Sequence, residues 1–141
     1  MTNLSTVENK ISTVEKNLEI LKRYEDTTKE DIENNIDLRG ALERYLFLTV
    51  QATIDLAGAF VSYWGFRKPS TFGESFQILR EKDILNESLT GELVKMTGFR
   101  NILVHDYEDL DYEVVLNVLK NKTDQIREFV DIIKSDPEVK S

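Results

Sequence analysis

Apolar residues recur at spacings of three and four along most of this chain, and this periodicity favours a helical fold. Glycine and proline, which most often interrupt helices, number only six and two among 141 residues. The clearest run alternates steps of three and four through Leu4, Val7, Ile11, Val14, Leu18 and Leu21. Such a seam packs one face of a helix onto a core or a partner subunit. The sequence therefore predicts an all-α protein.

Five helical segments follow from this pattern, with a charged connection at 26–36 after the first. The second segment is apolar around most of its circumference, so other parts of the protein or of a partner must cover it on more than one side. Thr71 and Glu74 have the spacing of a capping box at the start of the third. The expected boundaries are Leu4 to about Asp26, Leu38 to Trp64, Thr71 to Lys82, Asn86 to between His105 and Tyr107, and Asp109 or Asp111 to Ser135.

These segments predict an up-and-down helical bundle of about five helices. The chain is close to the commonest domain size, so we expect a single domain over 1–141, with 136–141 as a frayed tail. The seam on the first helix and the apolar girth of the second favour self-association.

Composition excludes several classes of site. The chain has no cysteine and one histidine, which excludes disulfide scaffolds, thiol nucleophiles and thiolate or multi-histidine metal sites. The 18 basic and 26 acidic residues give a net charge of -8, so any nucleic-acid site must be local. No apolar run approaches the roughly twenty residues of a membrane helix, and no signal peptide is evident. We expect a soluble cytoplasmic protein that makes no membrane contact.

The side chains best suited to catalysis lie in the segment 99–107. It places Arg100, Asn101, His105 and Tyr107 around the apolar triplet 102–104. A guanidinium is always charged and suits phosphate oxygens, whereas an imidazole exchanges a proton near neutral pH. Together they suit RNA cleavage in which a base activates the 2'-hydroxyl, its oxygen attacks the neighbouring phosphate, and a cation stabilises the accumulating charge. That reaction requires no metal ion.

The two side chains do not converge on an ideal helix. A separation of five residues turns the helix by roughly 500°, so Arg100 and His105 would point about 140° apart. Convergence requires either a helix that ends or tightens at His105, or a second subunit facing the pair across a two-fold axis. The helix dipole also favours both residues near a helix C-terminus, so spacing alone leaves a purely structural role open.

The octapeptide from Arg100 to Tyr107 resembles the pattern of HepT-like toxins in the HEPN superfamily: arginine, four residues, histidine, one residue, tyrosine. Residues 41–46 and 51–55 look like the second helix of that family, and 69–76 and 96–99 are also similar to it. The resemblance covers roughly 37–133 in compatible order.

This resemblance implies an all-helical homodimer whose motifs line a shared cleft. It implies a metal-independent endoribonuclease, the toxin of a toxin–antitoxin pair whose partner is a minimal nucleotidyltransferase antitoxin. Arg100 and His105 would be catalytic, and Asn101 would orient the RNA substrate or the histidine. Tyr107 would be the residue that the partner modifies with adenylate groups, because bulky anionic groups there would block the cleft and repel RNA. No cofactor and no metal site are expected.

The alternative is a noncatalytic nucleotide- or partner-binding helical module associated with a nucleotidyltransferase. The acidic charge keeps this alternative open, because the field of the whole chain does not attract RNA.

Three further features of the sequence each have two possible roles, one structural and one functional. Asp55, within an apolar helix, either pairs with Arg100 or another cation, or faces solvent beside Gln51. An aromatic and basic cluster at 63–68 has the composition to stack a base and hold a phosphate, but such aromatics are more often core and such cations solvated. An acidic run either caps the fifth helix or docks a basic partner. The cluster comprises Tyr63, Trp64, Phe66, Arg67 and Lys68, and the run comprises Glu108, Asp109, Asp111 and Glu113.

Overall fold

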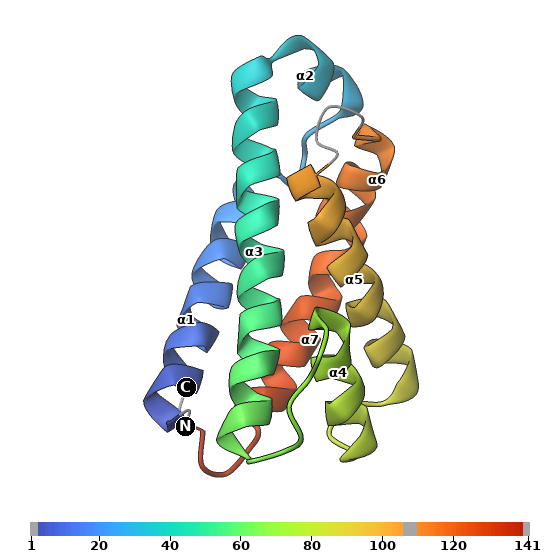
Figure 1. The fold of residues 1–141 in the computed structure, drawn as a ribbon. Helices are drawn as coiled ribbons and strands as arrows, with labels where there is room; N and C mark the ends of the chain where they lie inside the picture. Colours follow the sequence, from blue (N-terminus) through green and yellow to red (C-terminus); the bar gives the residue numbers. More distant parts are fainter. Residues whose placement is uncertain (1–2, 106–109, 140–141) are drawn as a thin grey trace.

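Two long helices, α1 (Leu4–Leu21) and α3 (Ile36–Tyr63), pack against each other along the bundle (Figure 1). The computed structural model describes residues 3–105 and 110–139 of the chain. The buried side chains of α1 include the predicted seam residues Val7, Ile11, Val14, Leu18 and Leu21. The seam therefore packs one face of α1 onto the core, as the sequence predicts.

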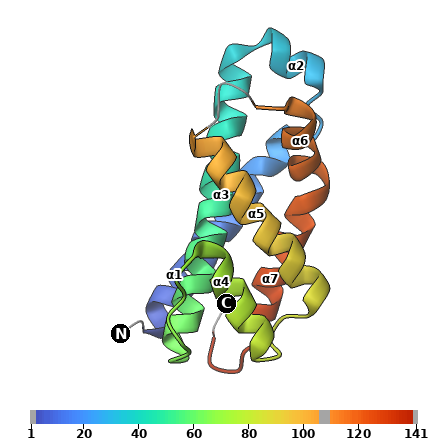
Figure 2. The same ribbon diagram turned by 45° about the vertical axis from the view of Figure 1, so that its right-hand side comes forward.

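The remaining elements complete an all-helical bundle. They are a 3-10 turn (Lys22–Tyr24), α2 (Lys29–Asn34), α4 (Phe72–Glu81), α5 (Glu87–His105), α6 (Tyr112–Asn117), a π-helical segment (Val118–Lys122) and α7 (Thr123–Lys134). Figures 1 and 2 both place α2 and α6 at one end of the bundle and α4 toward the other. The all-α fold is confirmed, because the described part of the chain contains helices and no strand.

The helix α3 is the central element of the core. Its buried side chains include Ile54, Leu56 and Ala57, which point in different directions around the helix. By length and composition α3 is apolar enough to cross a membrane, with a mean hydropathy of 1.4 in its most apolar window. However, 56% of that window is buried inside the bundle, which is the pattern of a core helix.

Three predicted helix starts are confirmed by their capping bonds. Thr71 Oγ1 accepts a hydrogen bond of 3.1 Å from the backbone N–H of Glu74, and Asn86 Oδ1 accepts one of 2.8 Å from Leu89. Asp111 caps α6 by accepting a hydrogen bond from the N–H of Glu113. The predicted capping box at α4 is altered, because the Glu74 carboxylate accepts from the N–H of Ser70 instead of Thr71.

Two features of the bundle differ from the expected five helices. The connection at 26–36 contains α2, which is stabilised by a reciprocal capping box between Thr28 and Asp31 and by burial of Ile32. The expected fifth helix is divided into α6 and α7 by the π-helical segment. Lys122, the last residue of this segment, contacts α5, because its Nζ lies 3.0 Å from the Glu92 carboxylate.

Residues 136–139, part of the segment expected to fray, pack against the bundle. Val139 is only 7% exposed, and the Glu138 carboxylate accepts a short hydrogen bond from the Tyr63 hydroxyl. A buried apolar side chain and a hydrogen bond to α3 hold this segment in place.

Candidate active site

The Arg100 guanidinium, near the C-terminal end of α5, is held by side chains from three helices. Its Nε donates a hydrogen bond of 2.8 Å to Oε1 of Gln51 on α3, and its Nη1 donates one of 3.0 Å to Oδ1 of Asn101. Its central carbon lies 5.8 Å from the ring centroid of Phe47 on α3 and 5.1 Å from that of Phe72 on α4. Aromatic faces attract a cation at these distances, so the guanidinium is fixed from several directions.

Asp55 is linked to Arg100 indirectly. Gln51 Nε2 donates a hydrogen bond of 3.0 Å to Oδ1 of Asp55, so the amide stands between the carboxylate and the guanidinium. In the described part of the chain, no carboxylate oxygen forms an ion pair with Arg100 within 4.0 Å. Because an amide is neutral, it orients the guanidinium without cancelling its charge.

His105 is the last residue of α5 and its side chain is exposed. Arg100 turns toward α3, and no hydrogen bond joins it to His105 within the described residues. The structure therefore brings Arg100 and Asn101 together and leaves His105 at the end of the helix. Tyr107, with Glu108 and Asp109 of the acidic run, lies outside the described residues.

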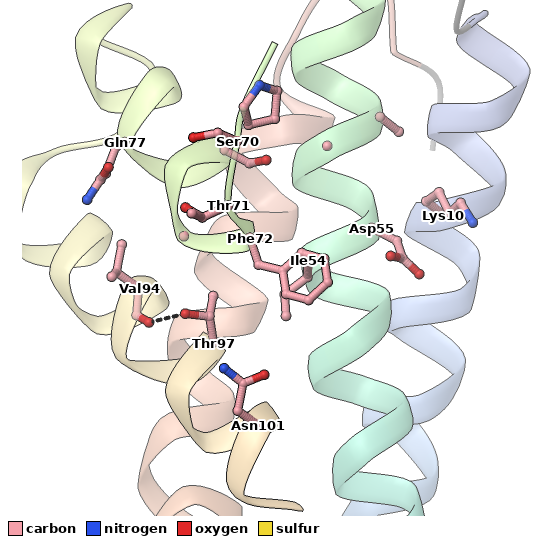
Figure 3. A pocket seen from close by; sticks show the side chains of 15 residues that line it. Lys10, Ile54, Asp55, Ser70, Thr71, Phe72, Gln77, Val94, Thr97 and Asn101 are labelled. Atoms are coloured by element: carbon pink, nitrogen blue, oxygen red, sulfur yellow. Dashed lines mark hydrogen bonds between the residues drawn. The ribbon is translucent and has the colours of Figure 1, made fainter. Parts of the chain in front are cut away.

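A groove of 920 Å³ opens beside this arginine, between α3, α4 and α5 (Figure 3). Asn101 and Thr97 line it from α5, Phe72 from the start of α4, and Asp55 from α3. A second hollow of 400 Å³ has Phe47 among its lining residues. The two rings that contact the Arg100 guanidinium therefore each line a different hollow.

The sequence pattern does not assign Phe47, Phe72 or Gln51 to the site. The only available signal was the i, i+4 spacing of Gln51 and Asp55 on an otherwise apolar helix, which allows their side chains to meet. Nothing in the sequence pattern distinguishes the two phenylalanines from core residues.

The aromatic and basic cluster at 63–68 has other partners. Arg67 forms ion pairs with Glu74 at 2.9 Å and Glu81 at 2.7 Å, while Lys82 lies over the Phe66 ring. The hydrogen bond from Arg67 lowers the pKa of the Glu81 carboxyl. Arg67 therefore ties the segment before α4 to that helix, and this part of the cluster is structural.

The geometry suits binding and stabilisation of a phosphate. Arg100 uses Nε and one N–H of Nη1 inside the protein, and a guanidinium has five N–H donors in total. Donors therefore remain for phosphate oxygens, and charge-assisted bonds of this kind are among the strongest hydrogen bonds in proteins.

Comparison with known proteins places the chain among ribonucleases. Residues 14–133 match the family described as Ribonuclease HepT-like. The mRNA nuclease HepT of Shewanella oneidensis is 27% identical over 129 residues, covering 91% of this chain and 96% of that protein. The tRNA nuclease HepT of Aphanizomenon flos-aquae is 32% identical over 113 residues, covering 79% of this chain and 77% of that protein.

The fold has a close counterpart among solved structures. The tri-AMPylated HEPN toxin of Shewanella oneidensis, solved in complex with its MNT antitoxin, superposes with a TM-score of 0.83 at 25% identity, over 93% of this chain and 98% of that chain. The family match spans most of the sequence and agrees with the fold. The chain therefore belongs to the Ribonuclease HepT-like family of the HEPN superfamily.

Proposed function

We propose that this protein is the endoribonuclease toxin of a toxin–antitoxin pair and that it cleaves RNA without a metal ion. The observation that carries the proposal is the setting of Arg100, whose guanidinium is oriented by Gln51 and Asn101 while its charge has no direct carboxylate partner in the described part of the chain. Relatives that span most of the chain are named as mRNA and tRNA nucleases. An arginine with free donors is what a reaction that accumulates charge on phosphate requires.

In the proposed mechanism, His105 removes the proton from a 2'-hydroxyl, and the 2'-oxygen attacks the adjacent phosphorus. Arg100 stabilises the negative charge on the nonbridging oxygens, and Asn101 orients the substrate or the histidine. The bond from phosphorus to the 5'-oxygen breaks, that oxygen takes a proton from water, and His105 gives its own proton back to the solvent. The products are a 2',3'-cyclic phosphate and a 5'-hydroxyl, and no step requires a metal ion or another cofactor.

The cleft is proposed to be shared by two copies of the chain. Within one chain, Arg100 faces α3 while His105 is exposed at the end of α5. In a two-fold dimer, Arg100 of one subunit and His105 of the other would reach the same phosphate. Co-expressing Arg100→Ala and His105→Ala chains tests this. Mixed dimers should regain part of the cleavage activity if Arg100 and His105 act across the interface.

The proposed partner is a minimal nucleotidyltransferase antitoxin that adds adenylate groups to Tyr107. The relative from Shewanella oneidensis was solved as a tri-AMPylated toxin with an MNT antitoxin, which supports the assignment. Tyr107 follows His105 by two positions, so anionic groups on it would lie close to the cleft and repel RNA phosphates. We propose that the pair acts in the cytoplasm.

The test is cleavage of total tRNA and of a messenger transcript in excess EDTA by protein whose intact mass shows an unmodified Tyr107. Wild type should cleave, whereas Arg100→Ala and His105→Ala should not. Cleavage by His105→Ala at the wild-type rate would contradict the catalytic role of that residue. Absence of cleavage by unmodified wild type would instead favour the noncatalytic binding module.

A further inference from the structure

The groove beside Arg100 contains an ordered series of chemical groups (Figure 3). Asn101 lies at one side, Phe72 and Ile54 lie in the middle, and Asp55 and Lys10 lie at the other side. The groove therefore runs from the arginine motif on α5, past an aromatic ring, to a cation on α1.

Phe72 is an exposed aromatic side chain at a fixed place. It is 45% exposed although it begins a capped helix, and its ring contacts the Arg100 guanidinium at 5.1 Å. The Thr71 cap and the ion pair of Arg67 with Glu74 hold the backbone at this point. A ring that is already ordered loses little conformational entropy when it stacks on a planar ligand.

The cations at the two sides of this ring have no ion-pair partner in the residues that the structure describes. Neither Lys10 nor Arg100 has a carboxylate oxygen within 4.0 Å there. Among the described residues, Asp55 is the single acidic one that lines the groove, and its Oδ1 already accepts the hydrogen bond from Gln51. Arg100 contacts the Phe72 ring but does not itself line the groove, and Lys10 lines it next to Asp55. An aromatic ring with a cation in contact with it and a second cation further along the groove complements a nucleic-acid strand, in which phosphates alternate with bases.

We propose that this groove binds the unpaired RNA segment next to the scissile phosphate, with a base stacked on Phe72 and the following phosphate near Lys10. This inference rests on the proposed nuclease function and specifies its substrate as single-stranded. A base inside a duplex has its faces covered by its neighbours, so stacking on Phe72 requires a base that is free of the helix. The proposed occupant continues directly from the phosphate that Arg100 contacts.

The test measures binding without cleavage, using a single-stranded RNA oligonucleotide that carries 2'-O-methyl groups throughout and therefore cannot undergo 2'-attack. Fluorescence anisotropy compares Phe72→Ala with Trp64→Ala, a change at an exposed aromatic residue that does not line the groove. Loss of one stacked base should weaken binding by about tenfold for Phe72→Ala. Trp64→Ala and the conservative Phe72→Tyr should bind as wild type does.

A second pair of variants avoids the contact between Phe72 and Arg100. Lys10→Gln should weaken binding and reduce the slope of log affinity against log salt by about 0.7, the value for one phosphate contact on a single strand. Lys16→Gln, an exposed lysine on the same helix but outside the groove, should leave both quantities unchanged. Thermal unfolding of all variants shows whether each one is folded.

The outcomes separate the two proposals. Wild-type binding by folded Phe72→Ala and Lys10→Gln, or no binding by wild type, would overturn the groove assignment even if the protein cleaves RNA. Weakened binding by both variants supports the groove even if unmodified wild type fails to cleave, a result that would overturn only the nuclease. Equal affinity of wild type for a fully paired duplex of the same sequence would overturn the single-strand specificity.

Discussion

Arg100 is oriented by a neutral amide, because its Nε donates a hydrogen bond of 2.8 Å to Oε1 of Gln51. The amide is fixed in turn by its hydrogen bond of 3.0 Å to Asp55. A carboxylate in the place of Gln51 would bind the guanidinium more strongly but would cancel the charge that a phosphate needs. The geometry thus combines a fixed orientation with an available positive charge.

Gln51→Glu should therefore reduce RNA cleavage, because the new carboxylate neutralises Arg100 while keeping the size of the side chain. We expect the single-turnover cleavage rate at neutral pH to fall by about a hundredfold to a thousandfold, the scale of losing one charge-stabilising donor. Asn9→Asp adds the same charge at an exposed position on α1 and should cleave normally. A wild-type rate for folded Gln51→Glu would contradict the role of the neutral amide.

Acid should weaken the attachment of the segment before α4. The pKa of Glu81 is lowered mainly by its hydrogen bond from Arg67, and that of Glu74 mainly by the backbone N–H of Ser70, with Arg67 adding to the effect. A carboxyl whose pKa is lower in the folded state stabilises the fold above its unfolded pKa of about 4.3, and this contribution is lost as pH falls through the folded pKa.

Arg67→Gln tests this attachment. The variant should have a lower Tm than wild type at pH 7, and the difference should narrow as pH falls below about 4. Arg23→Gln, at an exposed arginine that forms no ion pair within the described residues, should follow the wild-type profile. A Tm difference that stays constant down to the acid transition would show that these carboxyls are not responsible.

The core contact beneath α4 should dominate stability. Phe129 on α7 is fully buried, and its ring meets that of Phe76 edge to face at a centroid distance of 5.4 Å. Phe129→Ala should lower the free energy of unfolding by about 3–5 kcal/mol in a denaturant titration. Val114→Ala, at a side chain that is 45% exposed, should change it by less than about 0.5 kcal/mol. Comparable values for the two variants would contradict the assigned core.

The pKa of Tyr63 should show whether the C-terminal segment 136–139 stays in contact with α3. The hydrogen bond to Glu138, with burial and nearby carboxylates, raises the pKa of Tyr63 to about 12, because these groups disfavour the phenolate. Glu138→Gln should bring this pKa back toward the ordinary value of about 10. Ultraviolet titration of tyrosine absorbance, with Tyr63→Phe as the reference, measures the change. An unaltered titration would show that residues 136–139 do not hold this contact in solution.

Most of the fold follows from local patterns in the sequence. The seam of α1 and the caps at Thr71, Asn86 and Asp111 are each determined by residues a few positions apart, so periodicity and capping rules find them. The helix α2 was not predicted, because its capping box uses Asp31 in place of the usual Glu or Gln and only Ile32 is buried. The π-helical segment at 118–122 has no feature in the sequence that periodicity or capping rules detect.

The site was predictable only in part. Arg100, Asn101 and His105 share a short motif, and the structure places the first two in contact. Gln51 and Phe72 come from α3 and α4, and their contacts with Arg100 depend on how three helices pack. The sequence pattern of one helix does not predict contacts between side chains of different helices. The catalytic roles of Arg100 and His105 and the modification of Tyr107 stay predictions, which the cleavage experiments test.

The most direct test of the central claim is cleavage, in excess EDTA, of a defined RNA that carries a single 2'-deoxy nucleotide immediately 5' of a mapped cleavage site. Attack by the 2'-oxygen predicts that this one substitution abolishes cleavage at that bond. Neighbouring sites in the same RNA should still be cut to 2',3'-cyclic phosphate ends. Continued cleavage at the substituted bond would contradict the mechanism assigned to Arg100 and His105.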